Sequence, residues 1–306
     1  ILSDDARRKG QLIDLALELG TRSAGLKRSL PEGTLVALSE LVRVMNCYYS
    51  NLIEGHNTHP IAIERALRKN YDRDPKKRNL QKEAEAHVSV QRWIDGGGLA
   101  GRAATADAVY EIHRRFCSAL PDDLLWVEMP ETKERVRVIP GEVRQRFVEV
   151  GDHQAISPGA VPRFMQQFEN AYSQLSKAET VVNAAAAHHR LLWVHPFLDG
   201  NGRVARLMSH AMLLDALNTG AIWSIARGLG RNATTYKQHL AACDMTRRND
   251  LDGRGHLSEE TLTEFTSFFL KLCIDQVDFM EKLMEPSQLR TRIISWAEDE
   301  IKLAAL

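Results

Sequence analysis

The chain has 306 residues, of which 44% are hydrophobic and 26% are charged, with 40 basic and 40 acidic side chains. This length supports a large core, and zero formal net charge argues against a dedicated nucleic-acid or membrane surface. No apolar run reaches the roughly 18 residues of a membrane-spanning helix, so none is predicted.

The N-terminus, Ile-Leu-Ser-Asp-Asp, does not read as a signal peptide, and the missing initiator Met indicates a trimmed or incomplete start. The cysteines are isolated in apolar helical contexts without metal-ligand spacing: Cys47, Cys117, Cys243 and Cys273. We therefore expect buried free thiols and a cytoplasmic protein.

Apolar periodicity predicts a mainly α-helical fold. Helices are expected over residues 4–20, 31–53, 61–67, 80–94, 103–120, 162–177, 180–194, 204–217, 232–243, 259–284 and 287–303. Gly20 is expected to stop the first helix, and Gly96–Gly98 to end the one before them. The charged, proline-containing segment 71–79 is predicted to be a solvated loop.

One β-hairpin is expected among the helices. Residues 135–139 and 146–150 both alternate in polarity, and Pro140-Gly141 between them is a turn signal. Two strands alone are only marginally stable, so we predict that this hairpin packs on helices.

The most informative stretch is residues 195–206, HPFLDGNGRVAR. Pro196 disfavours helical geometry at His195, so the preceding helix should end there and a loop should enter the next helix. Gly200-Asn201-Gly202 can turn successive backbone N–H groups toward an anion, and the following helix adds its own unpaired N–H groups and dipole.

Four side chains of this stretch favour polyphosphate chemistry. Arg203 and Arg206 lie on one face of the first helical turn, where a bound anion would offset their unfavourable interaction with the helix dipole. Asp199 supplies an oxygen ligand of the kind Mg²⁺ prefers, and His195 can take a proton near neutral pH. The alternative is an arginine-rich helix start with a capping Asp and a packed His.

HPFLDGNGRVAR resembles the HPFxDGNGRxxR signature of the Fic family at every fixed position. The resemblance implies transfer of AMP from ATP to a protein hydroxyl. His195 would be the catalytic base, Asp199 the Mg²⁺ ligand, and Gly200, Asn201, Gly202, Arg203 and Arg206 the nucleotide-binding residues. Related Doc-type kinases typically carry Lys at the position of Gly202, so this glycine favours nucleotidyl over phosphoryl transfer.

The segment Ser50–Gly55 resembles the (S/T)xxxE(G/N) inhibitory motif of Fic proteins. By this resemblance Glu54 pairs with Arg206 and keeps the γ-phosphate of ATP from a productive pose. Gly55 suits the end of a helix, where a carboxylate such as that of Glu54 is unfavourable without a cationic partner. The alternative is a surface Glu at an ordinary helix end.

Two further roles follow from the resemblance alone. GEVRQRFVEVGDH resembles the flap that holds the target segment by strand addition, with Val148 pressing on it; the alternative is a structural hairpin. Tyr236 is assigned to the adenine pocket. We expect His113, His188 and His189 to be ordinary packing or hydrogen-bonding residues.

The predicted fold is therefore a Fic-type helical bundle with one short flap hairpin over the active site. Residues 1–79 would carry the inhibitory helix, residues 80–250 the catalytic core, and residues 251–306 the C-terminal helices. ATP, Mg²⁺ and a protein substrate along the flap are the implied ligands. Many relatives form homodimers.

Other outputs of the same loop stay open. Removal of AMP from a modified protein, or transfer of another phosphate-linked group, would use the same base, metal and anion site. A nucleotide-responsive regulator without catalysis is the third reading, although simple binding needs no base such as His195.

Overall fold

The computed structural model describes residue 2, residues 8–129, 132–151 and 153–285, and a few positions between 290 and 301. In this part of the chain 68% of the residues are helical, and the strands form two small antiparallel pairs. The mainly α-helical class is therefore confirmed.

The described residues form eleven α-helices. They are α1 (Lys9–Ser29), α2 (Glu32–Ile53), α3 (Pro60–Leu67), α4 (Pro75–Trp93), α5 (Ala106–Ser118), α6 (Val161–Tyr172), α7 (Lys177–Val194), α8 (Asn201–Leu217), α9 (Ile225–Arg231), α10 (Ala233–Cys243) and α11 (Glu259–Met284).

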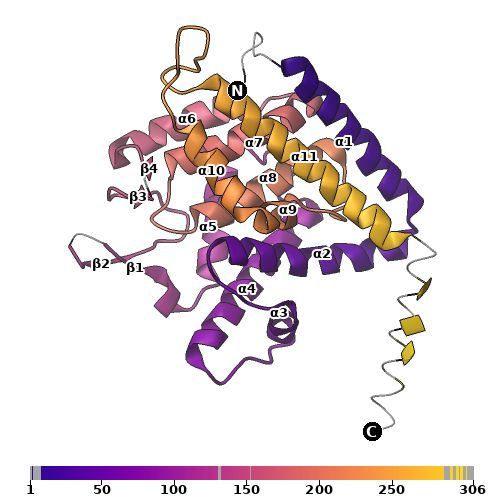
Figure 1. The fold of residues 1–306 in the computed structure, drawn as a ribbon. Coiled ribbons are helices and arrows are strands. Elements are labelled where there is room, and N and C mark those ends of the chain that lie inside the picture. The colour runs from indigo at the N-terminus through magenta and orange to yellow at the C-terminus, as the bar shows by residue number, and fades with distance from the viewer. Residues whose placement is uncertain are drawn as a thin grey trace.

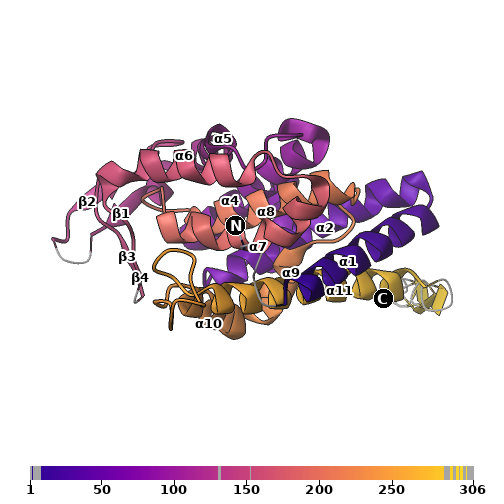
Figure 2. The same cartoon turned by 90° about the horizontal axis from the view of Figure 1, so that it is seen from above.

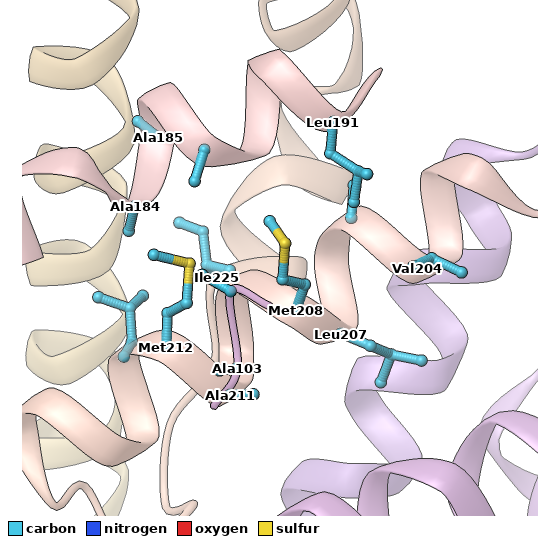
Figure 3. Packing of buried hydrophobic residues seen from close by; sticks show 14 of the residues in the cluster. Ala103, Ala184, Ala185, Leu191, Val204, Leu207, Met208, Ala211, Met212 and Ile225 are labelled. Carbon is cyan, nitrogen blue, oxygen red and sulfur yellow. The ribbon is translucent and has the colours of Figure 1, made fainter. Parts of the chain in front are cut away.

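Helices α7 and α8 pack along each other in the middle of the molecule, and the other helices surround them (Figures 1 and 2). Small side chains make this close approach possible. Ala184 and Ala185 of α7 lie opposite Met208 and Met212 of α8, whose flexible side chains fill the space between the helices (Figure 3). From Val181 onward α7 is mostly buried, so its C-terminal end is firmly held where the loop begins.

The sequence explains where α7 begins and ends. Ser176 and Glu179 form a capping box, in which each side chain bonds to the other's backbone N–H. At the far end His195 adopts the left-handed conformation, with φ 49° and ψ 62°, directly before Pro196. The predicted stop at His195 is confirmed.

Helix α2 lies across the bundle and packs on α4 and α9. It ends at Ile53 with Glu54 as its cap residue, and Gly55 follows at φ 84°. This left-handed glycine ends the helix as predicted, and it leaves Glu54 beside the start of α8.

Two predictions on the helices are wrong. Helix α1 continues through Gly20 to Ser29, because a glycine inside a helix lowers its stability without by itself ending it. The expected loop over residues 71–79 already contains the start of α4, since Asp74 caps it by accepting from Lys76 and Lys77. The α-helical part of α4 ends at Trp93 and one π-helical turn, Ile94–Gly98, follows; Gly97 is left-handed there at φ 89°, so the glycines end the helix as predicted.

The single predicted hairpin is also wrong in its pairing. Strand β1 (Trp126–Glu128) pairs with β2 (Arg135–Arg137), and β3 (Glu149–Val150) pairs with β4 (His153–Gln154). Between the two pairs the chain turns inward, where Val138 is buried and the N–H of Gly141 donates to His113. That inward turn separates the two segments that were expected to pair with each other.

Both strand pairs lie on the side of the bundle away from α1 (Figure 1). The last predicted helix, over residues 287–303, lies mostly outside the described residues. The division at residues 79 and 250 stays a prediction, although α1 packs along α11 and so brings the first and last segments together. No described helix combines the length and apolarity needed to span a membrane. The four cysteines are buried free thiols, as predicted.

Candidate active site

The loop between α7 and α8 presents a neutral imidazole. His195 is half-buried, and its Nδ1 lies 3.3 Å from the carbonyl oxygen of Leu192. A carbonyl can only accept, so Nδ1 carries the proton and Nε2 keeps its lone pair. Burial lowers the pKa of His195 to about 4, and the positive charges of His153 and Arg144 act in the same direction. The ring is therefore unprotonated at neutral pH and can accept a proton through Nε2.

Asn201 braces this loop from the first turn of α8. Its Oδ1 accepts from the N–H of Phe197 at 2.9 Å, and its Nδ2 donates to the carbonyl of the same residue at 2.8 Å. The sequence predicted contact with nucleotide for this side chain. Its amide instead holds the loop, and the ring of Phe197 is buried in the core.

His113 on α5 supports the loop from beneath. Its ring stacks on Phe197 at 3.8 Å between centroids, accepts from the N–H of Gly141 at 2.9 Å and donates to the carbonyl of Asp199 at 3.2 Å. From the sequence, His113 was predicted to be an ordinary packing or hydrogen-bonding residue. A polar ring on the apolar face of α5, between Ile112 and Phe116, was the available signal.

The start of α8 is an anion-binding position that already holds a carboxylate. Gly200 caps the helix at φ 83°, and the first N–H groups of any α-helix lack intrahelical acceptors. A Cβ atom at Gly202 would lie 2.5 Å from Oε1 of Glu54. The glycine therefore makes room for the carboxylate of Glu54 above the N-terminus of the helix.

Arg206 binds that carboxylate. Its Nη2 pairs with Glu54, and its Nε donates to the hydroxyl of Ser50 at 2.8 Å. Burial alone would raise the pKa of Glu54, but the charges of Arg206 and Arg203 outweigh it and hold the pKa below its ordinary value. Arg206 is buried, whereas the Glu54 side chain is 31% exposed, so water reaches the pair from the glutamate side. The predicted contact between these residues is present.

Arg203 is held by an acid that the sequence did not predict. The buried side chain of Glu83 on α4 forms an ion pair with Arg203 and a 2.9 Å contact with Nδ1 of His56. The hydrogen bond to Glu83 raises the pKa of His56. Arg203 also lies over the ring of Phe116, and its Nε has no hydrogen-bond partner among the described residues. Glu83 is one of several polar residues on the buried face of α4. This polar character was the only local indication in the sequence that Glu83 has a buried partner.

A cavity of about 220 Å³ adjoins these groups. Its polar lining comes from Glu54, His56, Glu83, Asp199 and Arg203. Asp199 is exposed, and its Oδ1 accepts from the N–H of Gly200 at 2.6 Å, which leaves the second carboxylate oxygen available. Within the described residues no three acidic, histidine or cysteine side chains form a ready-made metal site. A cation at Asp199 would thus need ligands from another molecule.

Residues 103–213 match the Fic/DOC family, and this range contains the loop, the whole of α7 and α8 as far as Leu213. The chain carries a Fic/DOC domain. Over 78 residues it is 44% identical to sequences named "Protein adenylyltransferase Fic" from Drosophila willistoni and Drosophila grimshawi. The match spans 25% of this chain and 16% of each relative's length.

Solved structures of Fic proteins share the fold. Fic-1 from C. elegans superposes with a TM-score of 0.67 at 17% identity, over 91% of this chain and 74% of that one. A Fic family protein from Desulfovibrio desulfuricans G20 gives 0.64 at 16% identity, over 87% and 73%. A Fic domain containing signaling protein from Bacteroides thetaiotaomicron VPI-5482 gives 0.62 at 20% identity, over 88% and 97%. The Fic-type helical bundle is confirmed.

Tyr236 on α10, outside the residues that match the family, does not take the role predicted for it. The residue is 2% exposed, and its hydroxyl donates to Nε2 of His188 at 2.7 Å. The ring packs against Phe265, and burial raises the pKa of its hydroxyl to about 12. A ring enclosed in this way offers no face to a nucleotide, so its assignment to the adenine pocket is wrong. His188 bonds to Ser209 on its other side, which confirms it as a hydrogen-bonding residue.

We expect Tyr236→Phe to lower the free energy of unfolding by about 1–2 kcal/mol, because it leaves Nε2 of buried His188 without its donor. Chemical denaturation measures this loss. Nucleotide affinity, measured by calorimetry, should stay unchanged. A variant of normal stability with weakened nucleotide binding would contradict the structural role and restore the pocket assignment.

The segment predicted to be the flap lies beside the end of α7. His153 of β4 donates to the carbonyl of Trp193 at 3.0 Å and pairs with Asp244 at the same distance. Val148 is half-buried just before β3, and its carbonyl accepts from the N–H of Ala155. Its neighbours Phe147 and Val150 are 70% and 50% exposed. The exposed apolar surface of the flap thus lies on these neighbours more than on Val148.

Proposed function

We propose that this chain is a protein adenylyltransferase, which transfers AMP from ATP to a Ser, Thr or Tyr hydroxyl of a target protein and is inhibited by its own Glu54. One observation carries the proposal. The neutral imidazole of His195, whose Nε2 carries a free lone pair, lies in the loop that enters α8, beside the carboxylate of Glu54 and the buried side chains of Arg203 and Arg206. The names of the curated relatives support the same reaction.

The residues at the start of α8 suit a polyphosphate. The Glu54 carboxylate occupies space that a Cβ atom at Gly202 would need and is paired with Arg206, which supports the binding of negative charge at this position. The β- and γ-phosphates of ATP would take the place of that carboxylate and bind Arg206 and Arg203. Free N–H groups of the first helical turn would bind the remaining phosphate oxygens. Asn201 would act indirectly, by keeping the loop in shape.

Asp199 suits the Mg²⁺ that accompanies ATP. Its carboxylate is exposed next to the helix start, and one of its oxygens is already oriented by the N–H of Gly200. When bound there, Mg²⁺ would neutralise charge on the α- and β-phosphates. Phosphate oxygens and water would complete the ligands, as is usual for this ion.

His195 would perform the proton transfer. Its Nε2 takes the proton of the target hydroxyl while that oxygen forms a bond to the α-phosphorus. The bond from the α-phosphorus to the bridging oxygen breaks, and pyrophosphate leaves with the electron pair. The positive end of α8 and the arginines stabilise the charge that develops on the phosphate oxygens. The product is the target protein with AMP esterified to its hydroxyl.

The target segment would lie along the flap. Among the described residues β3 pairs with β4 alone, so its other edge can bind an extended peptide by strand addition. Val148, Phe147 and Val150 would supply apolar contacts beside it. This places a hydroxyl of the peptide near the end of α7, where His195 lies.

Intact-protein mass spectrometry after incubation with ATP and Mg²⁺ tests the proposal. We expect an added mass of one AMP on the protein itself, more in a Glu54→Gly variant than in the wild type. The absence of any adduct, with ATP still bound, would instead favour removal of AMP from modified proteins or a nucleotide-responsive regulator. An adduct of different mass would indicate another phosphate-linked group.

The rate of AMP transfer is expected to stay constant from pH 8 down to about 5 and to show no inflection near 6.5, the ordinary pKa of histidine. The reason is that His195 must be unprotonated to act, and its pKa of about 4 keeps it so until the pH falls through that value. Initial rates at saturating ATP and Mg²⁺ give the profile. An acid limb centred near 6.5 would contradict either the lowered pKa or the role of His195.

A further inference from the structure

Arg144 is a buried cation that is bound by backbone carbonyls instead of a carboxylate. The residue is 3% exposed and lies just before the flap. Among the described residues no ion pair to it is found, and its guanidinium bonds to four carbonyl oxygens: those of His195 at 2.7 Å, Arg146 at 2.9 Å, Ile156 at 2.5 Å and Val194 at 3.4 Å. A buried charge without an anion is costly, so this arrangement requires an explanation.

Two of these bonds hold the turn that presents His195. The guanidinium binds the carbonyls of Val194 and His195, and the backbone N–H of Arg144 donates to the carbonyl of Pro196 at 2.9 Å. Three consecutive carbonyls are thus bound by one residue. His195 adopts the left-handed conformation there. This conformation is unfavourable for a residue that has a side chain, so it persists only where contacts with neighbouring residues stabilise it. Arg144 supplies that enforcement at the C-terminus of α7, where the helix dipole also favours a cation.

The remaining two bonds hold the flap. The carbonyls of Arg146 and Ile156 belong to the chain entering and leaving the β3–β4 pair. One guanidinium group therefore fixes both ends of the flap and the backbone of the proposed base at the same time.

The charge of Arg144 also acts on the imidazole of His195. The charged groups that influence this ring are Arg144, His153 on β4 and Glu54 beyond α2: the first two lower its pKa, and Glu54 raises it, although burial is the largest cause. Removing the charge of Arg144 should therefore move the pKa of His195 upward, toward its ordinary value.

We propose that Arg144 is the positioning residue of this site, which holds His195 in its left-handed turn and couples that base to the target-binding flap. This inference rests on the proposed adenylyl transfer only where the test measures the rate of AMP transfer. The geometry on which it stands is independent of the reaction. Arg144 touches neither nucleotide nor hydroxyl in this scheme, so it acts through His195.

The test compares Arg144→Lys with Arg144→Met in the Glu54→Gly background, where automodification is expected to be fastest. Lysine keeps the charge, but all its donors are on a single nitrogen atom. It therefore cannot bind the carbonyls of the His195 turn and those of the flap at the same time. Methionine removes both charge and donors. Arg248→Met is the matched control, because Arg248 is a surface arginine paired with Glu260.

We expect the rate at saturating ATP to fall about 10-fold in Arg144→Lys and about 100-fold in Arg144→Met, the loss typical of a misplaced catalytic group. The KM for ATP should change by less than about 2-fold, because the phosphate-binding residues are untouched. Arg248→Met should match the parent. If Arg144 only stabilised the fold, its variants would unfold more easily, but they would not combine a lower rate at saturating ATP with an unchanged KM.

Nuclear magnetic resonance of the His195 ring gives a readout that needs no activity. In Arg144→Met its pKa should rise, whereas in Arg144→Lys the pKa should stay and the ring should lose its uniform Nδ1–H tautomer. If Arg144→Met does not fold, Arg144→Lys decides alone. If no variant transfers AMP, the adenylyl-transfer proposal fails and the ring signals still decide. The role of Arg144 would be overturned if its variants transferred AMP at the rate of the parent. It would also be overturned if no protein transferred AMP and the His195 ring signals of the variants matched those of the parent.

Discussion

Replacing Glu54 with glycine is expected to raise the rate of automodification by about 5- to 150-fold, the range that corresponds to a coupling free energy of 1–3 kcal/mol between two ligands of one site. The carboxylate of Glu54 lies against Gly202 and is paired with Arg206, and in the proposed mechanism the terminal phosphate of ATP would bind at this same position. Two anions cannot share this position, so each productive encounter requires the carboxylate to leave first.

The increase should fall on the rate more than on nucleotide affinity. ATP can still bind through its other groups while Glu54 is in place, but its γ-phosphate is then misdirected. Titration calorimetry of ATP and initial rates by mass spectrometry separate the two quantities. The partly exposed side chain of Glu54 makes its departure feasible without unfolding of α2.

Two further variants test the electrostatic reason. Glu54→Gln keeps the shape of the side chain and removes its charge, so it should be activated to an intermediate extent. Glu32→Gly is the matched control, since Glu32 is an exposed glutamate at the opposite end of the same helix. Equal rates in wild type and Glu54→Gly would exclude an inhibitory role for this glutamate.

The sequence predicted the parts of the site that lie close together in the chain or belong to a recognised motif. Pro196 and the glycines defined the loop, and the end of α2 at Gly55 placed Glu54 correctly. Contact between Glu54 and Arg206 joins residues far apart in the chain. It was predicted only because two motifs were read together.

Contacts without a motif could not be predicted in this way. Glu83 reaches Arg203 only because α4 packs beside α2 and near the start of α8, a geometry that no local pattern encodes. The same holds for His113, whose partners Gly141 and Asp199 come from two separate loops. Both residues are polar groups on apolar helix faces, which signals an unknown partner but does not identify it.

The wrong predictions share a physical origin in tertiary context. The two alternating segments near Pro140-Gly141 had the correct local pattern for strands. Each pairs with a different strand, and hydrogen bonds of His113 and Arg144 hold the intervening chain inside the protein. Tyr236 occupies a helix that was placed correctly. Its ring turned inward because His188, buried on α7, needs a hydrogen-bond donor.

Replacing His195 is expected to lower AMP transfer by about 10²- to 10⁴-fold, the usual contribution of a general base. Two substitutions are needed because the backbone at this position is left-handed. His195→Asn tolerates that conformation and offers no base of suitable pKa, whereas His195→Ala removes the ring but adds backbone strain. Both should lose transfer, and His195→Asn should keep the stability of the parent.

ATP binding provides the internal control for this loss. The phosphate-binding residues lie on α8 and the loop, whose shape depends on Asn201, Phe197 and His113 instead of the imidazole of His195. Calorimetry should therefore give nearly unchanged affinity for ATP and Mg²⁺. His256→Ala, at an exposed histidine in the loop before α11, should transfer AMP at the parent rate. If His195→Asn binds ATP and still transfers AMP at the parent rate, another group must accept the proton, and the lone pair of Nε2 would then serve some other purpose in this loop.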